Sequence, residues 1–163
     1  MARKISKNYK SDYGYSYTDA AIFYLLNHSR TYLCDYFVFT NGDNLYAGGF
    51  VDFIADDMKN EFDIIGFNFI SHYVRYKPMN RGSEDLDDGT MHVVDSEFEY
   101  ANIDLGAFVI RAELLDLHKN LRFVAISRIS KWDVKGADGY LIAKSSNLAK
   151  TSRMHRQVLL IHQ

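Results

Sequence analysis

An apolar run at residues 37–39 stops abruptly at a polar cluster, residues 40–44, and this transition constrains the fold of the 163-residue chain more than any other feature. The run predicts a buried strand, and the cluster predicts the loop at the strand's carboxyl end. In open α/β sheets ligands bind at that edge, because side chains there converge on a crevice. Asp43 lies between the amides Asn41 and Asn44, so the loop has oxygen donors that suit a divalent cation held against a phosphate. The same residues also fit an ordinary Asn-Gly turn with Asp43 solvated.

Strand-like and helix-like segments alternate along the chain, which predicts an α/β domain. Thr18 or Asp19 is expected to cap the first helix, and the helical segments are residues 20–26, 50–60, 111–119 and 140–150. The strand-like segments are residues 36–40, 63–70, 103–110, 123–126 and 158–161. The second of these strands is expected to continue to Tyr76, just before the single proline.

Chain length predicts a single domain spanning residues 1–163, with residues 1–12 flexible and residues 79–91 a mobile loop. Four of the five residues from 84 to 88 are acidic. A Ca²⁺ site there is conceivable, but the spacing does not match the EF-hand pattern. A solvated acidic loop is therefore the expected structure.

Charge and cysteine content exclude several classes of protein. The formal net charge of -2 argues against a nucleic-acid-binding protein, which is usually markedly basic. No apolar run has the roughly 18 residues of a membrane span, and the basic N-terminus has no apolar segment behind it to make a secretory signal. Cys34 is the only cysteine, so no intramolecular disulfide can form. We expect a soluble, cytoplasmic protein.

Three more polar residues lie at expected ends of elements, and each has a plain structural explanation beside a functional one. Asp104 lies close to Gly106, and an aspartate in such a position most often stabilises a turn or caps a helix. Asp138 precedes an expected helix, where it would be an N-cap, or a general base if it faced a cleft. His162 is the penultimate residue. A terminal histidine is usually just exposed, but here an apolar strand delivers it, and imidazole is a good metal ligand.

These features, in this order, resemble the GT-A fold of nucleotide-sugar-dependent glycosyltransferases. In that family a hydrophobic strand ends in a D-x-D motif that binds Mn²⁺ or Mg²⁺ on the donor diphosphate, and residues 41–43, Asn-Gly-Asp, look like a variant of it. Residues 13–19 resemble part of the helical segment before that strand, and residues 103–111 are similar to the acceptor-side strand with its Gly-Ala pair. Asp138 lies where the family has its x-E-D motif, and residues 160–162 look like the late strand whose histidine completes the metal site.

The resemblance implies a divalent-metal-dependent enzyme that moves a sugar from a nucleoside-diphosphate sugar to a hydroxyl of a glycan or another acceptor. Asp43 and His162 would bind Mn²⁺ or Mg²⁺, and the metal would stabilise the leaving nucleoside diphosphate. The donor would contact Asn41, Asn44 and Asp19.

On the acceptor side, the resemblance implies that Asp138 deprotonates the attacking hydroxyl. The residues expected to contact the acceptor are Trp132, Asp104 and Gly106.

Two departures from the family pattern qualify the expected fold. Asn41 replaces the first acid of D-x-D, and only 40 residues precede it, whereas the family places its nucleotide-binding βαβ units there. The predicted fold is therefore a GT-A-like mixed sheet flanked by helices, with a reduced N-terminal nucleotide-binding half. The donor-base pocket is expected to be smaller, to be supplied by another chain of an oligomer, or to be lost with a missing N-terminal segment. The alternatives are a non-catalytic GT-A-like module and an unrelated hydrolase or phosphotransferase with Asp43 as nucleophile. The latter would lack both a G-x-S-x-G elbow and a P-loop.

Overall fold

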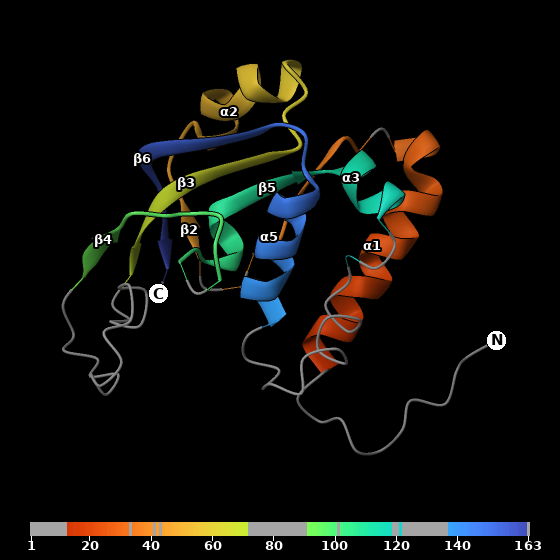
Figure 1. Ribbon diagram of the computed structural model, residues 1–163, viewed down its shortest axis with the longest axis horizontal. Coiled ribbons are helices and arrows are strands. Elements are labelled where there is room, and N and C mark those ends of the chain that lie inside the picture. Colours follow the sequence, from red (N-terminus) through yellow and green to blue (C-terminus); the bar gives the residue numbers. More distant parts are fainter. Residues whose placement is uncertain are drawn as a thin grey trace.

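The protein is a mixed α/β structure (Figure 1). The computed structural model describes residues 13–32, 34–40, 42, 44–71, 91–100, 102–118, 121 and 137–162. The helices are α1 (Tyr13–Tyr32), α2 (Phe50–Lys59), α3 (Ala112–Leu117) and α5 (Ala137–Leu148), with a 3-10 helix η2 (Leu105–Ala107). The strands are β1 (Tyr36–Val38), β2 (Leu45–Tyr46), β3 (Ile64–Ser71), β4 (His92–Val94), β5 (Phe108–Arg111) and β6 (Ser152–His162). The predicted strand at 123–126, the loop at 79–90 and the flexible residues 1–12 lie outside the described residues.

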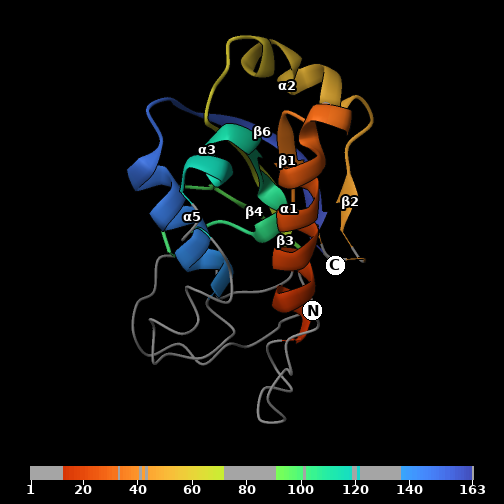
Figure 2. The same ribbon diagram turned by 90° about the vertical axis from the view of Figure 1, so that its right-hand side faces the viewer.

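The six strands form one curled, mixed sheet in the order β1-β5-β3-β6-β2, and β4 pairs with the carboxyl end of β3. Only the β3–β6 pair is parallel among these strands; the other pairs are antiparallel. Helix α2 lies on one side of the sheet and α5 on the other, while α1 stands at the β1 edge (Figures 1 and 2). This arrangement confirms the expected α/β class.

Strand β3 is the centre of the core, because helices cover both of its faces. Its burial is nearly continuous, as expected for a strand enclosed on both sides. The polar side chain in the middle of the strand, Asn68, is satisfied: its Nδ2 donates to Asp95 Oδ1 (2.9 Å) and to the Arg156 carbonyl (3.1 Å), and its Oδ1 accepts from the Ser96 amide (2.9 Å). Asn68 thereby fastens the ends of β4 and the bulged part of β6 to β3.

Helix α2 forms where predicted and is tied to β6 by a charged contact. Gly49, with φ of 78°, makes the left-handed turn that a residue with a side chain adopts rarely. Asp57, only 8% exposed, pairs with the imidazole of His155, and Arg153 Nε lies 3.8 Å from the same carboxylate. This contact joins the helix to the longest strand of the sheet.

The predicted cap of the first helix is wrong. Thr18 and Asp19 lie inside α1, which begins at Tyr13. The segment from 15 to 32 has neither glycine nor proline to interrupt it, so the helix extends through the polar residues that resembled a cap.

The predicted strand at 103–110 is only half right, because η2 occupies its first part. The carboxylate of Asp104 accepts the Gly106 amide (2.8 Å), and the Ala107 amide donates to the Asp104 carbonyl (3.0 Å). These two bonds wind the chain into a 3-10 turn before β5 begins at Phe108.

Two other elements begin earlier in the chain than predicted. Strand β6 starts six residues before the predicted Val158, because pairing with β3 recruits its polar first half. Helix α5 starts at Ala137, so Asp138 is its second residue rather than its N-cap. In the described part of the chain no helix is long and apolar enough to cross a membrane.

Candidate functional site

The carboxyl-terminal ends of β3 and β6 carry a row of polar side chains on one face of the sheet. Ser71 pairs with His92 of β4 on one side and with His162 of β6 on the other. Leu45 pairs with Ile161, so Asn44, one residue earlier in the antiparallel β2, lines up with His162. Residues opposite each other in a sheet present their side chains to the same face. Four strands therefore contribute to one polar row.

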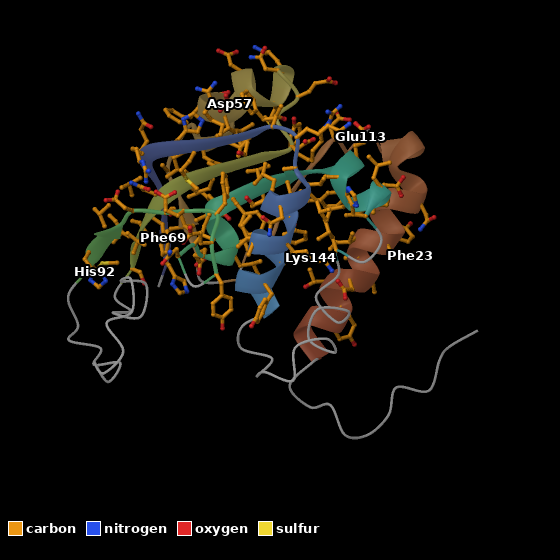
Figure 3. All side chains as sticks on the ribbon, viewed as in Figure 1. Phe23, Asp57, Phe69, His92, Glu113 and Lys144 are labelled. Carbon is orange, nitrogen blue, oxygen red and sulfur yellow. The ribbon has the colours of Figure 1, made fainter. Side chains whose placement is uncertain are left out.

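An apolar row lies directly beneath the polar one and explains why the polar row is held in place. The register pairs Tyr46 with Leu160, Leu160 with Phe69, and Phe69 with Val94. Phe69, Leu160 and Val94 are buried, and Figure 3 labels Phe69 inside the sheet and His92 at the tip of β4. The polar row is thus the rim of the hydrophobic core.

Helix η2 packs against this rim through Gly106. A Cβ added there would lie 2.6 Å from Asn44 Nδ2, 3.1 Å from Tyr46 Oη and 3.3 Å from Asp104 Oδ1. The Tyr46 hydroxyl also donates to the Gly106 carbonyl (3.0 Å). Three polar side chains from β2 and η2 therefore meet at a position where any side chain would clash with them.

His162 is buried beside a carboxylate. Its Nδ1 lies 3.8 Å from Asp104 Oδ2 and 3.5 Å from Ser71 Oγ, and His162 and Asp104 are 6% and 3% exposed. Both partners approach the same ring nitrogen. A Ser-His-Asp relay needs the serine and the acid on opposite nitrogens, so this arrangement is not such a relay.

Asn44 has an unsatisfied amide in this cluster. Its Oδ1 and Nδ2 atoms are both buried and have no hydrogen-bond partner among the residues that the structure describes. Leaving such a group unpaired costs about 1–3 kcal/mol. Orphaned polar atoms at a sheet rim are typical of places where a ligand or an ordered water supplies the missing bond.

Burial also affects the chemistry of Tyr46. Burial raises the pKa of its hydroxyl, a hydrogen bond with Thr40 acts in the opposite direction, and the charge of Asp104 raises the pKa further. The phenol is therefore a neutral hydrogen-bond donor in this cluster, and its ring packs 4.8 Å from the ring of Phe50 at the start of α2.

The donor set fits a hard or borderline divalent cation. An imidazole, a carboxylate and an amide oxygen are ligand types that Mn²⁺ accepts, and the buried negative charge of Asp104 favours a cation nearby. Within the described ranges no group of three or more His, Cys, Asp or Glu side chains is close enough to hold a metal ion. Of the two predicted metal ligands, His162 lies in this cluster and Asp43 is outside the described residues.

The structure brings four of the predicted site residues together. Asn44, Asp104 and His162 gather around Gly106, although the sequence suggested donor, acceptor and metal roles for them separately. The acceptor role predicted for Asp104 and Gly106 stays a prediction, because both are buried and their polar atoms face Asn44, Tyr46 and His162.

The other predicted site residues are not in this cluster or are not described. Asp19 belongs to α1, which lies across the molecule from the end of β6 (Figure 1). Asp138 is placed by its backbone at the start of α5, and α5 contacts η2. Asn41, Asp43 and Trp132 lie outside the described residues.

Sequence reasoning missed three members of the site: Ser71, His92 and Tyr46. Ser71 follows Phe69 by two positions in a buried strand, so strand alternation alone places it on the same face. His92 was missed because β4 is three residues long and follows an acidic segment. Tyr46 was missed because β2 has only two residues.

A groove at the opposite end of the sheet is a second possible site. It is lined by the start of β1, the end of α2 and the start of α3, and includes Cys34. Its two cations are already paired: Arg111 with Glu61 and Glu113, and Lys59 with an aspartate of its own helix. Among the described residues, the groove therefore has fewer polar groups without a partner than the rim around Gly106.

None of the protein-family models matches this sequence. Comparison with curated proteins likewise finds no significant match.

Proposed function

We propose that the protein is a divalent-metal-dependent glycosyltransferase that moves a sugar from a nucleoside-diphosphate sugar to an acceptor hydroxyl. The observation that carries this proposal is the cluster at Gly106: Asn44 and Asp104 approach the glycine, and His162, at the carboxyl end of β6, lies beside Asp104. These residues come from three distant parts of the sequence, and the resemblance to the GT-A family selected all of them as site residues.

The roles follow from the chemistry of the side chains. His162 would be a metal ligand, with Asp43 as the second, and bound Mn²⁺ or Mg²⁺ would neutralise the leaving diphosphate. Asn44 has a buried amide without a partner in the described part of the chain, which suits a hydrogen bond to an oxygen of the donor. The neutral Tyr46 donates to the Gly106 carbonyl and keeps η2 against β2.

Asp138 is the proposed base that takes the proton of the acceptor hydroxyl. Its helix packs against η2, so the start of α5 belongs to the same part of the molecule. Trp132 and Asp104 remain the proposed acceptor-side residues. The proposed acceptor is a glycan or another compound with a hydroxyl group. The proposed location is the cytoplasm.

The GT-A assignment itself belongs to this proposal. The antiparallel pairing of β1 with β5, and of β5 with β3, agrees with a sheet in which a strand bearing D-x-D lies beside the Gly-Ala strand. Among the described residues β1 is the last strand on its side, where the nucleotide-binding units of the family would continue the sheet. A partner chain in an oligomer would supply this reduced half.

The same edge favours a second candidate, a GT-A-like module that binds a sugar or a partner without turnover. Phe23 and Tyr24 on α1, the helix at the β1 edge, are exposed, so this helix offers aromatic side chains to a sugar or a partner. Turnover distinguishes the two candidates, because both predict binding at the rim.

Thermal denaturation with UDP- and GDP-sugars, in the presence and absence of Mn²⁺, tests the proposal. We expect a sugar nucleotide to raise the midpoint only with Mn²⁺, and His162→Ala and Asp43→Ala to abolish that increase. The matched control is His118→Ala, at the end of α3, which should respond as the unmodified protein does. No increase with any sugar nucleotide would contradict the proposal, and binding without release of nucleoside diphosphate would favour the binding module.

A further inference from the structure

We infer that α1 forms the interface of a symmetric dimer, in which the outward face of the helix packs antiparallel against the same face of a second copy of this chain. This interface is independent of the proposed function, because it follows from the exposure and spacing of side chains along one helix. It is also a surface where the proposed oligomer could assemble, since α1 stands at the β1 edge of the sheet (Figure 1).

The side chains of α1 divide into a covered face and an exposed face between residues 17 and 27. The covered face consists of Thr18, Asp19, Ile22, Leu25 and Leu26, which are buried or half-buried. The exposed face consists of Tyr17, Ala20, Ala21, Phe23, Tyr24 and Asn27. At 3.6 residues per turn each set occupies one continuous side of the helix. The covered side packs onto the core, so the exposed side points outward.

The exposed face is apolar and aromatic, the reverse of an ordinary surface helix. Tyr17, Phe23 and Tyr24 are 63%, 66% and 52% exposed. None of the described side chains on this face carries a charge, and the Asn27 amide donates to the Phe23 carbonyl of its own helix (2.6 Å). A surface helix normally presents charged and polar residues to water, and a helix that is apolar on every side is normally buried.

The outward face is accessible to another molecule. Figure 2 looks onto α1 and shows no other labelled helix or strand in front of it. Figure 3 labels Phe23 at the outer side of the molecule, away from α5. Aromatic residues are enriched, and charged residues depleted, in the cores of protein interfaces, so the composition of this face suits a protein partner.

The exposed stripe reads the same from both ends, which favours a second copy as the partner. Alanine occupies positions 20 and 21, and tyrosine lies three residues before and three residues after them. Two antiparallel copies, related by a twofold axis between Ala20 and Ala21, would place Tyr17 of each copy opposite Tyr24 of the other. A twofold dimer requires such a self-complementary patch. The spacing i, i+3, i+4, i+7 places all four residues on one stripe.

The sizes of these residues suit a helix pair. Alanines at the centre let two helix axes approach to the short end of the usual 8–10 Å range, and the antiparallel arrangement brings opposite ends of the helix dipoles together. At about 200 Å² for a fully exposed aromatic side chain, the aromatic residues of two copies would bury about 700 Å². Standard interfaces bury about 1,200–2,000 Å², so we expect a reversible dimer rather than an obligate one.

Sedimentation equilibrium of the full chain, without metal or sugar nucleotide, measures this dimer. We expect the average mass to rise from monomer towards dimer as the concentration increases through the micromolar range. Tyr17→Lys and Tyr24→Glu, each alone, should weaken dimerisation by about 10-fold or more, because each places two charges in the interface. The matched control is Val93→Lys, at an exposed apolar residue of β4, on the opposite side of the molecule from α1 (Figure 1). It should dimerise as the unmodified protein does.

A mixture of the two tyrosine variants tests the antiparallel register. In the mixed dimer the introduced lysine lies opposite the introduced glutamate, so the mixture should associate about 10-fold more tightly than either variant alone. A parallel pairing does not bring these positions together and predicts no gain. The pair Ala20→Lys and Ala21→Glu, at exposed positions that also face each other, repeats the test without removal of a tyrosine.

Several results would overturn the inferred dimer. A monomeric mass of the unmodified protein at every concentration would mean that another molecule, or another part of the chain, covers this face. A dimer that resists both tyrosine substitutions, or an absence of tighter association on mixing with both pairs of variants, would exclude the antiparallel contact of α1. Neither metal nor sugar nucleotide is present, so these outcomes are separate from those of the proposed function.

Discussion

At the scale of single residues, Gly106 determines whether the candidate site can form. Asn44, Tyr46 and Asp104 approach it so closely that even a methyl group would overlap with the first of them. The glycine is needed for close packing between η2 and β2. Its conformation is not the reason, because its φ is not in the left-handed region.

Gly106→Ala should therefore lower the free energy of unfolding by about 1–3 kcal/mol, the cost of overpacking a filled site. Gly48→Ala is the matched control, because no atom lies within 4 Å of its added Cβ, and it should change stability little. Urea unfolding of the two variants measures the difference. Equal stabilities would mean that η2 and β2 are not packed together as described.

Two asparagines near the rim give a second prediction. Asn68 makes three hydrogen bonds, whereas the side-chain atoms of Asn44 are buried and find no partner within the described ranges. Asn68→Ala should cost about 3 kcal/mol of stability because it leaves buried partners unpaired. Asn44→Ala should be neutral or stabilising by about 1 kcal/mol, because it removes an unpaired group.

If Asn44 serves a ligand, its removal should weaken binding of the Mn²⁺–nucleotide-sugar pair while stability is kept. Chemical denaturation and calorimetry of the same two variants check both halves of this prediction. A large loss of stability in Asn44→Ala would show that its amide is already satisfied.

At the scale of elements, the contact between α2 and β6 depends on Asp57. Asp57→Ala leaves His155 and Arg153 without their carboxylate and should cost about 2 kcal/mol, less than the 3–5 kcal/mol of a fully buried pair. Asp56→Ala, one residue earlier and on the exposed side of the helix, should cost less than about 0.5 kcal/mol. Thermal unfolding compares the two. A larger loss for Asp56→Ala would contradict the assigned role of the pair.

The elements that could be predicted from the sequence are those whose own apolar pattern identifies them without reference to neighbouring strands. Helix α2 and strand β3 have such patterns: α2 lies within one residue of its expected limits, and β3 begins one residue after its expected start. The expected continuation of β3 to Tyr76 lies outside the described residues. Strands β2 and β4 could not be predicted, because they are two and three residues long and exist only through pairing with longer neighbours. The first half of β6 is polar and is a strand only because β3 lies beside it.

The ends of apolar segments were a useful guide to which residues form the candidate site, but not to the role of each residue. Asn44, Asp104 and His162 were selected because each lies at the end of an apolar segment, and such ends converge in a sheet. The contact between Asp104 and His162 could not be predicted, because it depends on the turn of η2, which local hydrogen bonds to Asp104 impose. Register, which sequence alone did not define, placed Ser71 beside His162.

At the scale of the whole molecule, two partly buried tyrosines predict how stability depends on pH. Burial raises the pKa of both Tyr36 and Tyr46 above the ordinary value of 10.0. Above that pH the unfolded chain loses these protons while the folded chain keeps them, so stability falls as pH rises. Below pH 10 both states keep the protons and these groups give no pH dependence.

Tyr46→Phe should remove the part of this loss of stability at high pH that Tyr46 causes. At neutral pH the variant should be less stable than the unmodified protein by about 1 kcal/mol, because the bond to the Gly106 carbonyl is lost. The difference should narrow as pH rises from neutral to about 11, where the tyrosine of the unfolded chain ionises. Urea unfolding across that range tests this, and a difference that stays constant would contradict the assigned burial effect.

The proposal that the rim around Gly106 binds a divalent metal is tested most directly by the broadening of backbone amide NMR signals with substoichiometric Mn²⁺. We expect the amides of Asn44, Gly106 and His162 to broaden first, and His162→Ala to abolish the effect there. Broadening that begins elsewhere, for example at the acidic residues 84–88, and is unchanged in His162→Ala, would contradict it.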